Sequence, residues 1–160
     1  MRAEEGSVRG AGDAGMPPGV RELDHTADVG IRVAAASLDE LFVRAVGGTW
    51  YLVFGQPEGL EIAEPGDDAG ERAHDIRLHA DRTDGLLLKW LQELLYLYEV
   101  DGFVARRFRF DTLTERDLDC RVWGGPSRRE PVRDLKGVTY HGLEAKRTDD
   151  GWSARVIFDV

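Results

Sequence analysis

The sequence predicts an α+β fold: a single domain in which two helices pack on a mostly antiparallel β-sheet. Two segments have the apolar periodicity of helices, and the segments around and after them alternate apolar with polar residues, as half-buried strands do. A chain of 160 residues suits one hydrophobic core, and its composition, 42% hydrophobic and 32% charged, is that of an ordinary globular domain.

The N-terminal segment, residues 1–19, is rich in Gly, Ala and charged residues and ends in two prolines and a glycine. It has no apolar periodicity, so it cannot contribute a helix or strand face to a core. This composition predicts a disordered leader. We therefore assign the folded domain to residues 20–160.

The domain begins with two alternating stretches that predict strands, the second over residues 29–34. Ser37 and Glu40 then have the spacing of a capping box, in which a hydroxyl and a carboxylate bind the first free backbone N–H groups of a helix. Apolar residues recur at helical intervals after them. A first helix is therefore predicted from about 38 to 50.

A second helix follows a loop and a further strand. Residues 55–72 are rich in Gly, Pro, Asp and Glu and predict a loop with a short strand near 60–63. Residues 74–81 alternate and predict another strand. The second helix starts near Thr83, and its many leucines and aromatic residues leave little polar surface. We expect this helix at the centre of the core.

The second half of the domain, after Gly102, keeps the two-residue period of strands. Asp150-Gly151 lies between two such stretches and predicts a two-residue hairpin turn. Strict antiparallel pairing around this turn then fixes the register of the last two strands. The expected pairs are Leu143 with Phe158, Glu144 with Ile157, and Gly142 with Asp159.

Alternation along the last strand places Asp159 on the face opposite its apolar residues, so that Asp159 is not a core residue. The apolar phase of the partner strand slips at Gly142, which predicts a β-bulge there. Such a bulge would turn His141 toward the face of Asp159. We therefore expect this imidazole and this carboxylate to be neighbours.

Composition and charge exclude several classes of protein. The net charge of −9 argues against a protein that holds nucleic acid mainly by neutralising phosphates, although the C-terminal part, 105–160, is richer in basic residues and can contact an anionic partner. No apolar run is long enough to span a bilayer, and the N-terminus lacks a signal-peptide core, so we expect a cytoplasmic protein. The single cysteine, Cys120, is predicted to be a buried structural thiol.

Two aspartates, Asp28 and Asp159, are candidate metal ligands. A carboxylate at a strand end is usually solvated, and an isolated Asp is as often a turn or cap residue. Carboxylates close to the C-terminus would offer hard oxygen ligands, which suit Ca²⁺, Mg²⁺ or Mn²⁺ better than Zn²⁺. Spacing alone leaves both interpretations open.

Four sequence blocks, in order and with appropriate spacing, resemble the archease family, and the similarity spans residues 22–160. The blocks are HTADVGI at 25–31, WLQELLY at 90–96, VTYHGLE at 138–144 and RVIFDV at 155–160. The resemblance implies a two-layer α+β fold and a protein cofactor that promotes guanylylation and multiple turnover of a GTP-dependent RtcB-type RNA ligase. The ligase, active in tRNA splicing or RNA repair, would hold the GTP and the RNA.

The resemblance also implies roles for individual residues. Asp28 and Asp159, with main-chain or terminal oxygen from Val160, would bind a divalent cation, Ca²⁺ or Mn²⁺/Mg²⁺. Lys136 stands where the family has a functional lysine, although a solvated surface lysine is the alternative. The matching blocks also contain Glu93 and His141, which either support ligase activation or are structural. The chain departs from the family in the loop 124–131, which looks shortened and rewritten and puts the ligase contact in doubt.

Other functions stay open at this stage. One is a metal-dependent hydrolase with His141 as base, and another is a chaperone-like module. A third is an RNA-binding module that uses a group of arginines. That group comprises Arg106, Arg107, Arg109, Arg128, Arg129 and Arg133. We find no Walker-type loop, no Gly-x-Gly-x-x-Gly sequence and no nucleophile paired with a base, so no autonomous catalysis is expected.

Overall fold

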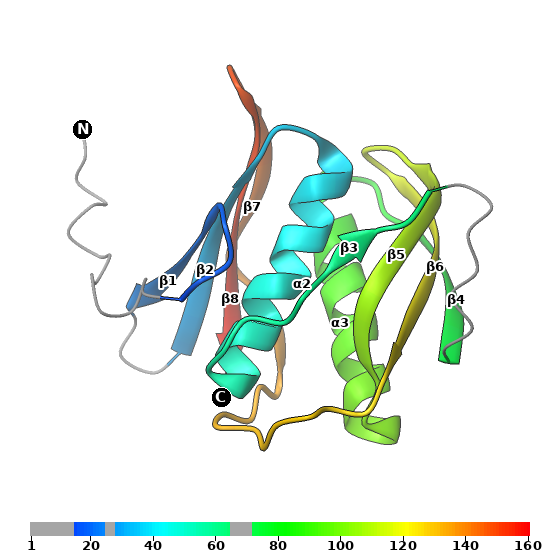
Figure 1. Ribbon diagram of the computed structural model, residues 1–160. Helices are drawn as coiled ribbons and strands as arrows, with labels where there is room; N and C mark the ends of the chain where they lie inside the picture. The colour runs from blue at the N-terminus through cyan, green and yellow to red at the C-terminus, as the bar shows by residue number, and fades with distance from the viewer. Residues whose placement is uncertain (1–14, 25–27, 65–71) are drawn as a thin grey trace.

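The computed structural model describes residues 15–24, 28–64 and 72–160. It confirms the α+β class, with two long helices and mostly antiparallel strands in the described part of the chain. The strands form two four-stranded sheets, where the sequence analysis expected one. Figure 1 shows both helices between the two sheets, so the domain has three layers rather than two.

The first sheet, sheet A, has the strand order β1-β2-β8-β7, and all its neighbours are antiparallel. Its inner face carries apolar side chains such as Ile31 and Val156, both fully buried. The side chains of β2 and β8 point alternately to a helix-facing side and an outer side, and Ile157 is buried although it lies on the outer side. The strands are β1 (Val20–Asp24), β2 (Asp28–Ala35), β8 (Gly151–Asp159) and β7 (Gly137–Thr148).

The second sheet, sheet B, has the order β3-β5-β6-β4 and covers the other side of the helices. The predicted short strand near 60–63 is confirmed as β3, which pairs in parallel with β5. The predicted strand 74–81 is also confirmed, but it begins and ends two residues earlier. The strands are β3 (Glu61–Ile62), β5 (Val104–Leu113), β6 (Asp117–Gly125) and β4 (Arg72–His79).

The helices are α2 (Leu38–Phe54) and α3 (Thr83–Asp101). Ser37 is the N-cap of α2, and its hydroxyl accepts a hydrogen bond from the backbone N–H of Glu40 at 3.4 Å. The Glu40 carboxylate reaches back to the N–H of Ala36 at 3.1 Å, one residue before the position that a standard capping box uses. The helix continues beyond the predicted end at residue 50 and stops at Gly55, whose φ of 74° favours glycine.

Indole N–H groups tie the helices together and to sheet B. Trp90 of α3 donates to the carbonyl of Phe42 in α2 at 3.1 Å, and Trp50 of α2 donates to that of Ala105 in β5 at 2.9 Å. Both indoles are fully buried, which confirms α3 as a central element of the core. The prediction for Cys120 is also confirmed, because its thiol is buried and burial raises its pKa.

The hairpin between β7 and β8 has a different register from the predicted one. Its turn is formed by Asp149 and Asp150, so that Thr148 pairs with Gly151. Gly151 therefore belongs to the β-ladder and not to the turn, and glycine is required there because an added Cβ would lie 2.2 Å from the carbonyl oxygen of Ala35. The predicted pairs Leu143–Phe158, Glu144–Ile157 and Gly142–Asp159 are therefore wrong.

The predicted bulge in β7 is confirmed. The pairing with β8 shifts between Thr139 and Glu144, and Gly142 has a φ of 69° within that interval. Such a positive φ is strained for any residue with a Cβ, so glycine is required at this point.

The predicted leader, residues 1–19, falls mainly outside the described residues, which begin at Gly15. Pro17 accepts a hydrogen bond from the N–H of Val20 at 3.2 Å, and Met16 packs against the core. Ordered chain therefore begins before the predicted domain boundary at residue 20. Neither described helix is long and apolar enough to cross a membrane.

Candidate metal and partner-binding site

Asp28 and Asp159 lie directly opposite each other, at the start of β2 and the end of β8. Directly opposed residues in a sheet point to the same face, and their Cα atoms are about 4.5–5.5 Å apart. Two like charges in this position destabilise a sheet unless a cation lies between them. The preceding residues of the first block, His25, Thr26 and Ala27, lie outside the described part of the chain.

Lys136 joins this end of sheet A through β7. Gly137 is the cross-strand partner of Asp159, and the N–H of Lys136 donates to the Asp159 carbonyl at 2.8 Å. The Lys136 ammonium binds the carboxylate of Asp134 at 2.9 Å, and this hydrogen bond raises its pKa. The fold therefore gathers Asp28, Asp159 and a firmly protonated lysine from three neighbouring strand ends.

The donor set at this end fits a divalent cation that is incompletely enclosed. The two carboxylates supply hard oxygen atoms, and Val160, which is 48% exposed, is a candidate for a further main-chain oxygen. Among the residues that the structure describes, no group of three or more His, Cys, Asp or Glu side chains is placed to hold a metal. The chain would therefore leave several coordination positions to water or to another molecule.

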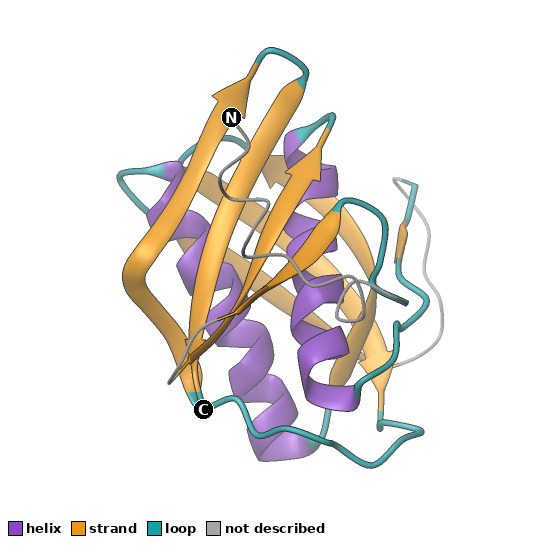
Figure 2. Ribbon diagram, turned by 90° about the vertical axis from the view of Figure 1, so that its left-hand side faces the viewer, coloured by secondary structure: helices purple, strands orange, loops and turns teal. Residues whose placement is uncertain are grey.

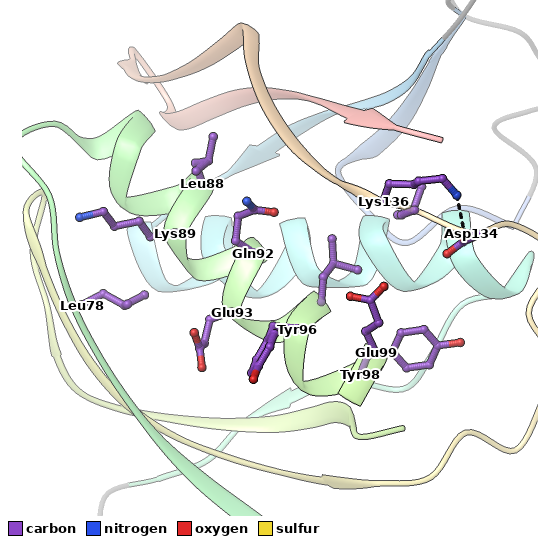
Figure 3. Close-up of a pocket in the computed structure, with 12 residues that line it drawn as sticks. Leu78, Leu88, Lys89, Gln92, Glu93, Tyr96, Tyr98, Glu99, Asp134 and Lys136 are labelled. Atoms are coloured by element: carbon purple, nitrogen blue, oxygen red, sulfur yellow. Dashed lines mark hydrogen bonds and ion pairs between the residues drawn. The ribbon is translucent and has the colours of Figure 1, made fainter. Parts of the chain in front are cut away.

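A groove of about 490 Å³ runs along the exposed side of α3, next to Lys136. In Figure 3, Glu93 lies on the Leu78 side of this groove and Lys136 on the Asp134 side, so the structure brings these two predicted residues to one groove. The lining residues are Leu78, Leu88, Lys89, Gln92, Glu93, Leu95, Tyr96, Tyr98, Glu99, Asp134, Leu135 and Lys136.

Gln92 connects this groove to the strand ends, because its side-chain carbonyl accepts a hydrogen bond from the N–H of Val138 at 3.0 Å. This bond holds the start of β7 against α3 and so positions Lys136. The sequence analysis did not single out Gln92. An amide side chain in a helix of leucines and aromatic residues was the only signal for it.

His141 does not lie beside Asp159, contrary to the prediction. Asp159 pairs with Gly137, and His141 lies four residues further along β7, within the bulge. The bulge begins after the Thr139–Ile157 pair, which lies two residues from Asp159 along β8, or about 7 Å at about 3.3 Å per residue. Two features cause this difference: the turn at Asp149 and Asp150 shifts the register of the whole hairpin, and the bulge between Thr139 and Glu144 shifts it further before Gly137 meets Asp159.

The arginines considered for RNA binding are mostly paired with carboxylates. Neutralised guanidinium groups contribute little to binding phosphates, so sheet B does not offer the basic surface that the sequence suggested. The ion pairs are Arg106–Glu58 (3.2 Å), Arg107–Glu61 (3.2 Å), Arg109–Asp111 (3.1 Å), Arg129–Glu58 (2.7 Å) and Arg133–Glu22 (3.8 Å).

Of the segment 124–131, the first two residues end β6, and the loop that follows is fixed to the domain by Glu58. The carboxylate of Glu58 is only 6% exposed and binds both Arg106 and Arg129. Arg106 also donates to the carbonyl of Pro126 at 2.8 Å. This loop is therefore part of the packing of the domain.

Comparison with known proteins agrees with these observations. Residues 21–160 match the model of the Archease protein family (MTH1598/TM1083). The chain belongs to the archease family. It is 32% identical over 145 residues to Protein archease of Methanosarcina barkeri, covering 86% of this chain and 93% of the relative. The corresponding protein of Pyrococcus furiosus is 30% identical over 145 residues, covering 86% and 95%.

Two solved structures share the archease fold. The solution structure of Methanobacterium thermoautotrophicum protein 1598 has a TM-score of 0.65 and 25% identity, covering 89% of this chain and 99% of that one. The crystal structure of an archease from Thermotoga maritima, described as a possible chaperone, has a TM-score of 0.56. At 16% identity over 86% of this archease and 94% of that chain, it shows the fold alone.

Proposed function

We propose that this archease is a cytoplasmic, metal-binding protein cofactor that promotes guanylylation and repeated turnover of an RtcB-type RNA ligase in tRNA splicing or RNA repair. The observation that carries the proposal is the meeting of Asp28, Asp159 and Lys136 at one end of sheet A. This arrangement combines a candidate cation site with a lysine beside it. RNA would be reached only through the ligase.

Each of these residues has a defined task in the proposal. Asp28 and Asp159 hold the divalent cation, with Val160 at the open side of the site. The cation, Ca²⁺ or Mn²⁺/Mg²⁺, would supply positive charge to phosphate oxygens in the active site of the partner. The ammonium of Lys136, protonated beside Asp134, offers a second positive group from the neighbouring strand end.

The α3 groove is the surface that we assign to the ligase. Glu93 and Glu99 line it together with Tyr96, whose side chain is 57% exposed. Carboxylates around an exposed aromatic ring suit a basic segment of a partner, because an arginine can bind both. A hydrolase mechanism has less support, since the proposed base His141 is separated from Asp159 by the register of β7.

The test combines the cognate ligase, GTP and RNA with a 3′-phosphate or 2′,3′-cyclic phosphate end. Wild-type archease at less than one equivalent should accelerate both ligase guanylylation and multiple-turnover ligation, and should neither join nor cleave RNA by itself. Asp28→Asn should remove the acceleration. The control Asp75→Asn changes a carboxylate that binds Arg121 on sheet B and should leave the acceleration intact.

An unchanged ligation rate with wild-type protein would refute the activator role. Cleavage of RNA or esters by this archease alone would favour the hydrolase instead. If Asp28→Asn activates as well as wild type, the carboxylate pair takes no part in activation.

A further inference from the structure

The outer face of sheet A carries a row of arginines that the proposed function does not use. Arg32 on β2 is the direct cross-strand partner of Arg155 on β8, and Arg21 on β1 is the partner of Arg32. Figure 2 looks onto this sheet, with the helices behind it. Because the adjacent residues Ile31 and Val156 are buried against the helices, the arginines project from the other side.

Neither Arg32 nor Arg155 has an ion pair or a side-chain hydrogen bond within the described part of the chain. The Nε of Arg155 is even buried without a hydrogen-bond partner. The only carboxylate in this row, that of Glu144 opposite Arg155, binds Lys146 at 3.1 Å. Two like charges directly opposite each other and an unsatisfied N–H both cost stability.

A shortage of acidic residues does not explain this arrangement, because the chain has 30 acidic and 21 basic residues. Arginines on sheet B are paired: Arg121 binds Asp75 at 2.8 Å and Arg77 binds Asp119 at 3.3 Å. The contrast indicates that no carboxylate among the described residues neutralises Arg32 and Arg155, which leaves both guanidinium groups available to an external anion.

The bulge in β7 makes room for one of these guanidinium groups. An added Cβ at Gly142 would lie 3.5 Å from both Nε and Nη2 of Arg155. The guanidinium therefore lies along the bare backbone of the bulge, which limits its freedom before any ligand binds. A charged group held in place in this way loses less conformational entropy on binding.

We propose that Arg32 and Arg155 form a binding site for a phosphate monoester. Each guanidinium offers a fork of N–H donors, and one fork already saturates both oxygens of a carboxylate. A terminal phosphate has three free oxygens and a charge close to −2, so it can satisfy two guanidinium groups at once. The source is either a free phosphate or mononucleotide, or the phosphorylated end of a nucleic acid strand.

The experiment titrates the full-length protein, in the presence of EDTA, with inorganic phosphate, a nucleoside 3′-monophosphate, and a short RNA with a 3′-phosphate or a 3′-hydroxyl. Binding is followed by calorimetry and by the backbone amide signals of residues 32, 142 and 155. EDTA removes any contribution of a cation at Asp28 and Asp159, so the outcome is independent of the ligase proposal.

Arg32→Gln and Arg155→Gln should each weaken binding of the phosphorylated probes by about tenfold or more, as expected for a lost charged hydrogen bond. Arg121→Gln, which removes an arginine already paired with Asp75, should bind like wild type. Arg32→Lys keeps the positive charge but loses the fork of N–H donors, so its affinity for the phosphorylated probes should lie between those of wild type and Arg32→Gln. Thermal melts of the Gln variants should be no lower than that of wild type, because each removes one of two opposed like charges.

The pH dependence provides an independent check. The second pKa of a phosphate monoester is near about 6, so affinity should fall between pH 7.5 and 5 while the arginines stay charged. Tighter binding of the 3′-phosphorylated RNA than of inorganic phosphate identifies a strand end as the source, and equal binding identifies the phosphate group alone. Absence of binding by wild type, equal loss in Arg121→Gln, or affinity that does not change with pH would overturn the proposal.

Discussion

Asp28 and Asp159 are direct cross-strand partners, the first residue of β2 facing the last residue of β8. One belongs to the beginning of the domain and the other is the penultimate residue of the chain. The central position of β2 and β8 in sheet A holds the two carboxylates together before any ligand is present. Their mutual repulsion is the physical reason to expect a cation between them.

The first prediction concerns that cation. Asp159→Ala should abolish binding of Ca²⁺ or Mn²⁺ in calorimetry and leave the circular dichroism spectrum unchanged, because Asp159 is exposed at a strand end. In the absence of metal the variant should melt no lower than wild type, since one of two like charges is gone. Asp75→Asn is the control and should bind the metal normally. Equal metal affinity in Asp159→Ala and wild type would contradict the assignment.

Lys136→Ala should impair ligase activation with little change in melting temperature. The side chain is exposed, and its ammonium forms an ion pair with Asp134, whose side chain is also exposed. Lys146→Ala is a matched control, because Lys146 is also an exposed lysine paired with an acidic residue, Glu144, on the same strand. A large fall in melting temperature for Lys136→Ala, or equal loss of activation in the control, would mark Lys136 as having no specific role.

Gly30→Ala should destabilise the domain by about 1–3 kcal/mol in urea unfolding, as overpacking of a filled site does. A Cβ at Gly30 would lie 2.7 Å from Cδ1 of Ile157 and 2.8 Å from the carbonyl oxygen of Val156. Gly59→Ala is the control, because a Cβ there meets no atom within 4 Å. Equal unfolding free energies for the two variants would show that the packing around Ile157 adapts.

Glu58→Gln should lower the unfolding free energy by about 3 kcal/mol, since it leaves Arg106, only 13% exposed, without its charged partner. Arg129→Gln should cost less, because Arg129 is 37% exposed and Glu58 would still bind Arg106. Urea unfolding of both variants measures the difference. The reverse order of the two effects would mean that Arg129, not Arg106, anchors the loop.

Cys120 should not react with a thiol reagent such as DTNB at pH 8 until the protein unfolds. Burial raises the pKa of its thiol above the ordinary value of 9.0, so the native protein presents neither access nor thiolate. Above about pH 9 the Cys120 thiol loses its proton in the unfolded state but keeps it in the folded state. The free energy of unfolding should therefore decrease as the pH rises above about 9. Rapid labelling of the native protein would show that this part of sheet B opens readily.

Local sequence patterns were sufficient to predict most of the helices and strands. Alternation identified β2 and β8, the spacing of Ser37 and Glu40 located the start of α2, and the phase slip located the bulge at Gly142. Each of these signals depends on a few consecutive residues, whose side chains and backbone decide their own conformation. The order of four short blocks likewise indicated the family, which the comparison with known proteins confirms.

The pairing of distant residues needed the tertiary structure. The family resemblance implied that Asp28 and Asp159 share one site, but strand periodicity gave no rule that places them opposite each other, and it wrongly suggested His141 as a neighbour of Asp159. It also gave no sign that the strands divide into two sheets or that Arg32 and Arg155 have no carboxylate partner among the described residues. Register and sheet membership depend on which faces can be buried together, and a shift of a turn by one residue changes every pair beyond it. The sequence by itself determined the elements and the buried side of each strand, whereas packing of the whole chain decided which charged groups meet.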